Sequence, residues 1–346
     1  MLTGRLRWRR FFSLVLACAA AFALLSTTEA QAEIIPVRDM LRGTHVPQAQ
    51  CARPGAVWVT AYGRGFCIRY YLSIAGGNDL QPVVYLTGDK LGVYDSKTQS
   101  FRPDPKDPNY RDDDFDTDKM GRWVANFSKS TKAPGIYLAR VGVDGSSGFH
   151  GVRKTVLELH AMNAALDAIK RRHHFTGFNL VGQSGGAKLV GGLLALRADI
   201  TCAVLGSGPL DYKPNLSSPD PGKRYFNVAN FAPTIARNRN ARILVVTDPA
   251  DRTVSAEKQT GFVRKLRQAG GQAEQFFVRA SDPLHHGVRR YSSLAAAECM
   301  RGADTREISI KLAQLERTQS ATSAANPKFA PQLPLDGLRT SGSKRH

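Results

Sequence analysis

The chain has 346 residues, of which 48 are Lys or Arg and 29 are Asp or Glu, and its net charge at pH 7 is +19. This length suits one large α/β domain better than two small ones. The basic residues lie in short clusters without aromatic interleaving, which excludes a dedicated nucleic-acid-binding protein. They form either a solvated surface or a surface that attracts anionic envelope polymers, lipid or substrate.

Residues 1–32 are predicted to be a secretory signal peptide rather than part of the fold. Arginines precede the apolar run Phe11–Leu25, and Ala30-Gln31-Ala32 supplies small residues for cleavage before Glu33. The run is too short to span a bilayer comfortably, so we expect no transmembrane span. The pair of arginines before Phe11 leaves a twin-arginine export route open. Cleavage would leave 314 residues with a net charge of +16, secreted or in the periplasm.

Four cysteines follow the signal: Cys51, Cys67, Cys202 and Cys299. An even number in an exported protein favours two disulfides, and none of the spacings resembles a zinc site. The sequence does not fix which cysteines pair. Because Cys51 and Cys67 bracket a candidate hairpin, we expect these two to pair, which leaves Cys202 for Cys299.

The domain is expected to open with a hairpin. Its strands, Ala56–Tyr62 and Phe66–Ile74, are joined through Gly63-Arg64-Gly65. Pro82–Leu86 is a short apolar run typical of a buried strand, and it ends at Thr87-Gly88-Asp89-Lys90.

An acidic stretch around Asp114 has the alternating carboxylates of a calcium-binding loop. Counting from Asp114, however, the sixth position is Lys119 rather than glycine and the twelfth is Ala125 rather than glutamate, so the EF-hand pattern fails. We instead expect Asp116 or Thr117 to cap a helix. Its apolar face would contain four residues: Met120, Trp123, Val124 and Phe127.

Further apolar runs alternate with helical patterns along the rest of the chain. The expected strands are Gly135–Val141, Phe178–Val181, Thr201–Leu205, Arg242–Thr247 and Glu274–Arg279. Helices are expected at Val152–Arg172, directly after Ser184, and around Phe262 to Leu266. This alternation predicts an α/β fold with a mainly parallel central sheet and helices on both faces.

Three segments are expected to be irregular. Val143–Gly148 has the composition of a flexible loop at the end of a strand. Residues 209–240 are polar and contain prolines, and they form a candidate small lid. From about Arg317 the chain is rich in Ser, Thr, Pro and Ala without apolar periodicity. We therefore expect a folded domain at residues 33–316 and a disordered tail at residues 317–346.

The sequence Gly182-Gln183-Ser184-Gly185-Gly186 places a serine between a strand-like run and a helical pattern. So sharp a turn needs neighbours without Cβ atoms, which Gly182 and Gly186 provide. The turn exposes the Ser184 hydroxyl above the sheet and directs the amide of Gly185 toward an oxyanion beside it. The pattern alone arises by chance in some chains, but the strand before it and the helix after it favour a nucleophile.

A serine nucleophile needs a base, and the base needs a carboxylate that fixes its tautomer. In a parallel sheet such residues gather at the carboxyl ends of the strands. One strand-end loop offers Asp248 and Asp251 as the acid, and we prefer Asp251. The next offers His285 and His286 as the base. Either aspartate can instead form a turn or cap a helix.

These features resemble the α/β-hydrolase family over nearly the whole expected domain. Gly182–Gly186 matches the family's nucleophile motif, and Asp251–Ser255 is similar to its acid loop, with a serine where proline is usual. His286-Gly287 is similar to the histidine-glycine pair of its esterase and prolyl-oligopeptidase-like branches, and the chain order Ser, Asp, His agrees. Thr87-Gly88 stands where many members have His-Gly, which implies Asp89 as the second oxyanion-hole residue.

The resemblance implies an exported serine hydrolase with Ser184 as nucleophile and His286 as base. Asp251 would orient the base, and the amides of Gly185 and Asp89 would form the oxyanion hole. No metal or organic cofactor is implied. We expect a carboxylic esterase acting on a small ester. A peptidase of the prolyl-oligopeptidase-like type, acting on a short peptide, and a non-catalytic basic module that binds envelope polymers are the alternatives.

Overall fold

The computed structural model describes four stretches of the chain: residues 33–95, 100–102, 114–212 and 218–325. The expected signal peptide, residues 1–32, lies outside the described residues, and so does the segment 326–346. From Ile34 onward the chain groups into a single unit. In the described part of the chain, no helix combines the length and the apolar character that crossing a membrane requires.

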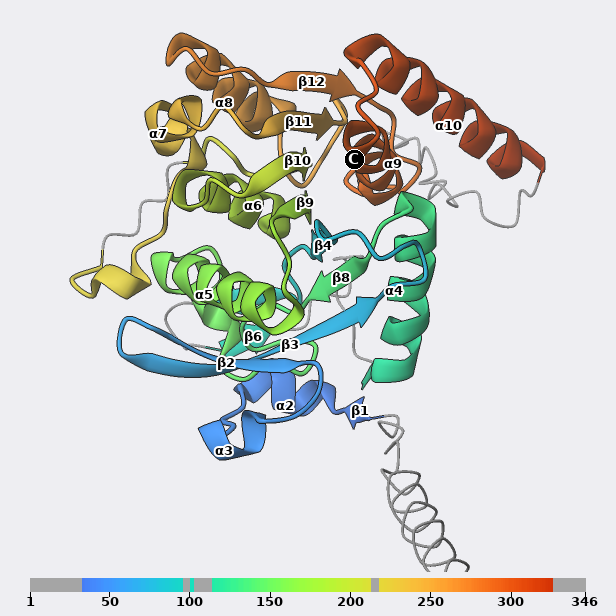
Figure 1. Cartoon of the computed structure of the whole chain (residues 1–346). Helices are drawn as coiled ribbons and strands as arrows, with labels where there is room; N and C mark the ends of the chain where they lie inside the picture. The colour runs from blue at the N-terminus through green and yellow to red at the C-terminus, as the bar shows by residue number, and fades with distance from the viewer. Residues whose placement is uncertain (1–32, 96–99, 103–113, 213–217, 326–346) are drawn as a thin grey trace, which may run out of the picture. The chain divides into compact units, whose positions relative to one another are not determined.

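An eight-stranded sheet runs through this unit (Figure 1). In spatial order its strands are β2 (Ala56–Ala61), β3 (Arg64–Ser73), β8 (Gly135–Leu138), β4 (Val83–Leu86), β9 (Phe178–Gln183), β10 (Ile200–Gly206), β11 (Arg242–Thr247) and β12 (Glu274–Phe277). All neighbours from β8 to β12 are parallel, whereas β3 is antiparallel to both β8 and β2. The expected mainly parallel sheet is confirmed.

Helices cover both faces of the sheet, as expected (Figure 1). One face carries α5 (Val156–His173), α6 (Gly185–Leu196), α7 (Ala232–Arg237) and α8 (Ala256–Gln268), and the other carries α4 (Thr117–Thr131), α9 (Arg289–Met300) and α10 (Thr305–Ala325). Each layer encloses its own apolar core, with Leu166 and Leu189 in the first and Phe127 and Tyr291 in the second.

The side chains of β4 show why the parallel strands are continuous apolar runs. Val84 and Leu86 lie in the core beneath α5 and α6, whereas Val83 and Tyr85 lie in the core beneath α4 and α9. Successive side chains of a strand point to opposite faces, so a strand covered on both faces must be apolar at every position. The run that predicted this strand reflects burial on two sides.

The antiparallel hairpin at one end of the sheet turns through Tyr62 and Gly63. Both residues have positive φ, at 48° and 70°, which matches the right-handed twist of the flanking strands. Arg64 already pairs with Ala61, so the expected link at Gly63-Arg64-Gly65 begins one residue too late. The two-residue turn is favoured because Gly63 adopts positive φ without steric cost.

Asp116 caps α4, as one of the two expected alternatives. One oxygen of its carboxylate accepts hydrogen bonds from the main-chain N–H groups of Asp118 and Lys119 at 2.9 and 3.0 Å. These bonds, with the nearby charge of Lys119, lower the pKa of the Asp116 carboxyl. Thr117 is the first residue of the helix. The described end of the acidic stretch therefore caps α4.

Two disulfides join the cysteines in the expected pairs. Cys51, in the short helix α3 (Gln48–Cys51), bonds to Cys67 of β3, with Cα atoms 5.5 Å apart. Cys202 of β10 bonds to Cys299 of α9, with Cα atoms 6.2 Å apart. The second bridge is separated by 97 residues of sequence, which include β11, β12 and the loops that follow them. It therefore ties α9 directly to the middle of the sheet.

Smaller elements lie at the periphery of the sheet. They are β1 (Ile34–Ile35) paired with β7 (Phe115–Asp116), β5 (Val93–Asp95) paired with β6 (Ser100–Arg102), α2 (Val37–Arg42), and the 3-10 turns η1 (His150–Val152), η2 (Pro221–Lys223) and η3 (Val228–Phe231).

The loop Val143–Gly148 differs from the flexible segment that we expected. The Ser147 hydroxyl accepts a hydrogen bond from the N–H of Cys67 at 2.8 Å, and the Ser146 hydroxyl accepts one from the N–H of Arg69 at 3.0 Å. Both serines are buried. The loop is therefore fixed along β3, because its side chains satisfy main-chain donors that the strand leaves unpaired.

The irregular tail does not begin at Arg317, because α10 continues to Ala325. Ala, Gln, Leu and Glu are good helix formers, and they are frequent between Leu312 and Ala325. Leu312 packs in the core shared with α9, which holds the first half of the helix against the domain. The helix extends past the expected boundary because its helix propensity and the packing of Leu312 compensate for its weak apolar periodicity.

Candidate active site

Ser184 lies on a strained turn between β9 and α6, with φ at 55° and ψ at −118°. Residues other than glycine adopt such a conformation only at a cost in free energy. A Cβ atom on Gly182 would lie 2.5 Å from the nitrogen of Ala187, and one on Gly186 would lie 2.1 Å from the carbonyl oxygen of Leu86. The turn therefore requires both glycines, for the close approach that the sequence suggested.

His286 and Asp251 meet at the carboxyl end of the sheet, in the loops after β12 and β11. His286 Nδ1 lies 2.8 Å from Asp251 Oδ2, and both side chains are buried. The other carboxylate oxygen accepts hydrogen bonds from the N–H groups of Thr253 and Val254 at 2.8 Å each. Because a carboxylate only accepts, Nδ1 donates to it and Nε2 of the neutral ring is left as an acceptor.

The adjacent histidine has a different partner. His285 Nδ1 lies 3.1 Å from Asp248 Oδ2, which also accepts a hydrogen bond from the N–H of Ala280 at 2.7 Å. His285 has a positive φ of 54° and a side chain that is 23% exposed. The structure thus forms two His–Asp pairs from the four residues that the sequence left open.

Ser184 and His286 line one cavity of about 860 Å³, which His285 does not line. Gln183 Nε2 donates to the carbonyl oxygen of His286 at 2.7 Å, so the two loops are joined beside the serine. Within the described residues, no hydrogen bond joins Ser184 Oγ to His286. Such bonds are often long before a substrate is bound, so the absence of this one does not exclude the pair.

The wall of the cavity combines aromatic rings with cationic side chains. The aromatic residues are Tyr85, Phe115, Trp123 and Tyr137, and the cationic ones are Lys90, Lys119, Arg289 and Arg290. The expected lid, residues 209–240, contributes no described residue to this wall. Its residues Phe226 and Val228 instead pack against Gly191 and Gly192 of α6. The described part of the segment thus packs its buried apolar residues on α6, and the lid stays a prediction.

Two tyrosines of the wall remain neutral phenols over the ordinary pH range. Burial raises the pKa of Tyr85 to about 12. Burial, together with the adjacent negative charge of Asp144, raises the pKa of Tyr137 well above its usual range. The Tyr137 hydroxyl donates to the Asp144 carboxylate, which also lies 2.6 Å from the Lys90 ammonium. The charges of Lys90 and Asp144 beside Tyr137 are therefore paired with each other.

The expected oxyanion-hole residues lie on the serine turn and in the segment that follows β4. Gly185 is the first residue of α6, and the N–H groups of a helix's first turn have no acceptor within the helix. Gly88 lies directly against the serine, since a Cβ atom on it would be 3.2 Å from Ser184 Cβ. Asp89 follows Gly88 and lines the same cavity. The structure thus brings Asp89 and Gly185 to the serine.

Lys188 of α6 is fully buried, and its amine has no hydrogen-bond partner within the described residues. Its Nζ lies 4.8 Å from the centre of the Phe226 ring. Burial lowers the pKa of Lys188 to about 7. The helix that begins at the serine therefore carries an amine that is partly neutral near neutral pH.

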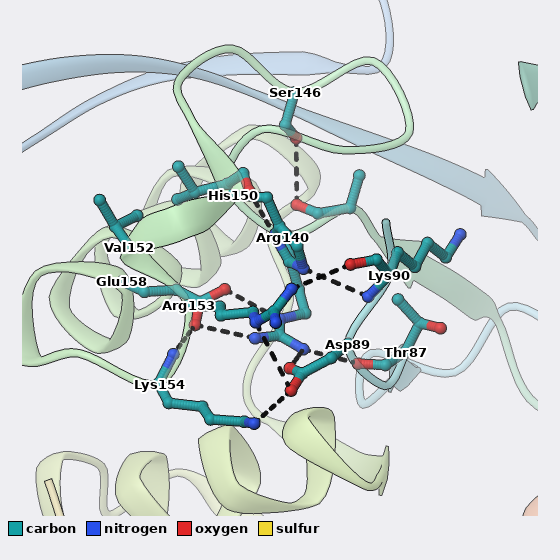
Figure 2. A network of polar contacts seen from close by, with 12 residues as sticks. Thr87, Asp89, Lys90, Arg140, Ser146, His150, Val152, Arg153, Lys154 and Glu158 are labelled. Atoms are coloured by element: carbon teal, nitrogen blue, oxygen red, sulfur yellow. Dashed lines mark hydrogen bonds and ion pairs between the residues drawn. The ribbon is translucent and has the colours of Figure 1, made fainter. Parts of the chain in front are cut away.

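A group of buried polar side chains behind the cavity was missed from the sequence. Arg140, His150 and Glu158 are each fully buried, and they form a network with residues that follow β4 (Figure 2). Thr155-Val156-Leu157-Glu158 is a helix-start pattern that marks Glu158 as a possible cap, and it was the one signal available. Nothing in the sequence indicates that Arg140 is its partner.

No three His, Cys, Asp or Glu side chains gather closely enough to hold a metal ion, in the part of the chain that is described. The chemistry available at this site is that of a serine, a histidine, a carboxylate and main-chain amides. Such a set can transfer an acyl group through a covalent intermediate.

A scan against protein-family models finds no match, and a search of curated proteins finds none either. Among solved structures, the chain is similar to esterase Pf2001 of Pyrococcus furiosus, at 14% identity and a TM-score of 0.49, over 75% of this chain and 97% of that one. It is similar to Est1E from Butyrivibrio proteoclasticus bound to ferulic acid, at 13% identity and a TM-score of 0.48, over 71% and 98% of the two chains.

The chain is also similar to an acylaminoacyl peptidase of Pyrococcus horikoshii, at 12% identity and a TM-score of 0.45, over 72% of this chain and 40% of that one. At such identities a likeness concerns architecture and not substrate. The order and direction of the strands, with a sharp strand-turn-helix at Ser184, give this chain the α/β-hydrolase fold that the sequence resemblance implied.

Proposed function

We propose that this protein is a serine hydrolase that cleaves a carboxylic ester through an acyl-enzyme. One observation carries the proposal: His286, bonded to the buried carboxylate of Asp251, lines the same cavity as Ser184 on its strained turn. A base with a fixed tautomer in the same cavity as a serine hydroxyl is the arrangement that activates serine.

In the proposed reaction, Ser184 Oγ bonds to the carbonyl carbon of the ester while His286 Nε2 takes its proton. The carbonyl oxygen becomes an oxyanion, which accepts hydrogen bonds from the main-chain N–H groups of Gly185 and Asp89. The tetrahedral intermediate collapses, the bond to the alcohol oxygen breaks, and the histidine returns its proton to that oxygen. Water then repeats the sequence and releases the acid, while Asp251 stabilises the charged ring throughout.

The aromatic residues in the wall of the cavity favour a substrate ester that carries an apolar or aromatic group. Tyr85 and Trp123 lie with ring centres 5.1 Å apart, and Trp123 stacks on Phe127 behind the wall at 5.2 Å. Flat apolar surface of this kind favours planar or aliphatic groups, because it removes their surface from water. A short peptide amide is the second substrate class, since the same residues can cleave an amide bond.

Export is the second part of the proposal. The two disulfides support it, because such bonds persist in oxidising compartments and are rare in the cytosol. The signal expected at residues 1–32 agrees with a secreted or periplasmic location. The net charge of +16 on the remainder supports an attraction to anionic envelope polymers. Binding of the mature protein to such polymers should weaken as salt is raised.

The experiment that tests the function is labelling with a fluorophosphonate probe, in the wild type and in Ser184→Ala. The wild type should be labelled and should hydrolyse nitrophenyl esters faster than aminoacyl amides, whereas the variant should do neither and should remain folded by circular dichroism. Faster amide cleavage would make the protein a peptidase. A wild type without labelling or turnover would favour the non-catalytic binding module. Ser146 and Ser147 serve as controls, because their bonded hydroxyls should not react.

A further inference from the structure

The segment Thr87–Gly92 after β4 lies directly against the serine turn. Gly88 approaches the serine as described above, and the carboxylate of Asp89 occupies the space beside Gly185, where an added Cβ atom would lie 2.1 Å from Asp89 Oδ1. The segment contains no helix or strand, so no regular main-chain hydrogen bonding fixes its shape. Its shape depends on other groups.

Side chains from the segment after β8 bind main-chain atoms of Lys90 and Gly92. The Lys90 N–H donates to His150 Nε2 at 3.4 Å, and the Lys90 carbonyl oxygen accepts from Arg153 at 3.0 Å. Arg153 also donates to the carbonyl oxygen of Gly92 at 3.3 Å. Burial, with the neighbouring charges of two arginines, lowers the pKa of His150 well below its usual range, so the ring remains neutral and able to accept. The far half of the segment is thus fixed at three points.

Arg140 holds the near half of the segment, at Thr87 and Asp89 (Figure 2). One of its terminal nitrogens, Nη1, donates to the carbonyl oxygen of Thr87 at 3.3 Å and to Asp89 Oδ1 at 3.0 Å. Its other two nitrogens donate to the two oxygens of Glu158 at 2.8 and 2.9 Å. The side chains of Arg140 and Glu158 are both 0% exposed. The planar guanidinium therefore connects Glu158 rigidly to the residues on both sides of Gly88.

The Glu158 carboxylate does not make the capping hydrogen bond that its position in α5 predicts. In a capping box, a glutamate at the third helical position bonds to the N–H of the capping residue, which here is Thr155. The Glu158 carboxylate instead accepts from the N–H of Lys154 at 2.6 Å and from Arg140. The Thr155 hydroxyl makes only its half of the box, a 3.4 Å bond from the Glu158 N–H. The Glu158 carboxylate therefore binds Arg140 instead of completing the capping box.

Three cationic side chains lie close to the Asp89 carboxylate. Its carboxylate pairs with Arg140, with the Lys154 ammonium and, at 3.8 Å, with Arg153. Burial acts to raise the pKa of Asp89, but these cations hold it well below its usual range. The side chain is therefore a fixed anion, and it cannot swing toward the cavity without breaking its contacts with these three cations.

We propose that Arg140, oriented by Glu158, is a positioning residue that fixes the main-chain N–H of Asp89 for the oxyanion. The inference rests on the hydrolase function proposed above. It follows from the contacts on both sides of Gly88: the carbonyl of the residue before it and the carboxylate of the residue after it share one guanidinium nitrogen. The peptide planes between those two points have little freedom, and they carry the amide that the reaction needs.

The expected effect is on the transition state rather than on the bound ester. An oxyanion-hole donor acts on charge that develops during the reaction, and its loss lowers kcat by about 100-fold or more. Displacement of the donor should lower kcat in the same way and leave KM nearly unchanged.

The test compares Arg140→Lys with Arg197→Lys in the mature protein. Lysine keeps the charge but cannot bond Glu158 at two points and reach the 87–89 segment at once. Arg197 is the matched control, because its side chain is 5% exposed and bonds Asp199 at two points and Asp167 at 2.6 Å, with none of these residues lining the cavity. Measurements are kcat and KM for a nitrophenyl ester, inhibition by a matching trifluoromethyl ketone, and Tm.

For Arg140→Lys we expect kcat to fall about 100-fold, KM to change less than about 3-fold, and ketone affinity to fall by about the same factor as kcat. Arg197→Lys should lower Tm and keep kcat and ketone affinity within about 3-fold of wild type. Glu158→Gln keeps the shape of the side chain, and it should lower kcat about 10-fold with the same split between kcat and KM. This variant decides the question if Arg140→Lys does not fold.

The proposal is overturned if Arg140→Lys and Glu158→Gln lower Tm yet retain the kcat and ketone affinity of the wild type, as the Arg197 control should. It is also overturned if KM rises with kcat unchanged. Turnover that persists in Ser184→Ala would reject the hydrolase mechanism itself, and that result is separate from any effect at Arg140.

Discussion

His285 and His286 are consecutive residues that each contact an aspartate through Nδ1, yet the two pairs differ in every other respect. His286 is buried, lines the cavity with Ser184, and bonds Asp251 at 2.8 Å. His285 is more exposed, does not line the cavity, and bonds Asp248 at 3.1 Å. The pairs thus differ in whether the histidine lines the cavity that contains Ser184.

The two aspartates also differ in the groups that their carboxylates bind. Asp248 accepts from the N–H groups of Ala250 and Ala280, and so ties the end of β11 to the residues after β12. Asp251 uses one oxygen for its own turn and leaves the other to His286. We interpret the first pair as a structural link between loops and the second as the proposed catalytic pair.

The largest effect is expected for His286→Ala, which should lower kcat about 10⁴-fold because the proton of the serine hydroxyl loses its acceptor. His285→Ala is the matched control, and it should change kcat less than about 3-fold, since that ring does not face the serine. Steady-state kinetics of both variants on one nitrophenyl ester measure the difference. The reverse ranking would assign the proposed base to His285.

The next effect is expected for Asp251→Asn. The amide keeps the size of the carboxylate but removes its charge and can hold the ring in the wrong tautomer, so kcat should fall about 10³-fold with the fold preserved. Kinetics and Tm on the same preparation check this. Equal activity of wild type and variant would show that the ring does not need this carboxylate.

A smaller effect on turnover than in Asp251→Asn is expected for Asp248→Asn. This change replaces an acceptor of three hydrogen bonds, so it should lower the free energy of unfolding by about 1–3 kcal/mol while kcat changes less than about 10-fold. Urea denaturation and the ester assay give the two values. A larger loss of kcat than in Asp251→Asn would exchange the roles of the two aspartates.

The nucleophile turn could be predicted because its requirements are local. Glycines at 182 and 186 and an apolar run before them are visible in sequence, and the close contacts at both glycines follow from the turn itself. The meeting of the acid and base loops could also be predicted, because the carboxyl ends of parallel strands share one edge. From the sequence we prefer Asp251 over Asp248, but the hydrogen bonds of the Asp251 carboxylate, one oxygen to the main chain and the other to His286, could not be predicted.

The network behind the oxyanion segment could not be predicted for a different reason. An arginine after a strand is usually a solvated residue, and Arg140 is buried only because Glu158 and Asp89 arrive from separate parts of the chain. The loop Val143–Gly148 was expected to be flexible for the same reason, because the sequence does not show which residues its serines contact. Its serines satisfy donors of β3 that are close in space but about 80 residues away in sequence.

The buried amine of Lys188 couples the stability of the fold to protons. In the unfolded chain this group has a pKa near 10.5, and in the folded protein burial lowers the pKa to about 7. Between these values the unfolded chain binds a proton that the folded protein lacks, so the free energy of unfolding should rise with pH across this window. Below pH 7 the folded protein carries the full cost of a buried charge. Replacing Lys188 by Met should therefore stabilise the protein most at acidic pH, and urea denaturation at pH 6 and pH 9 would show a smaller difference in the variant than in the wild type.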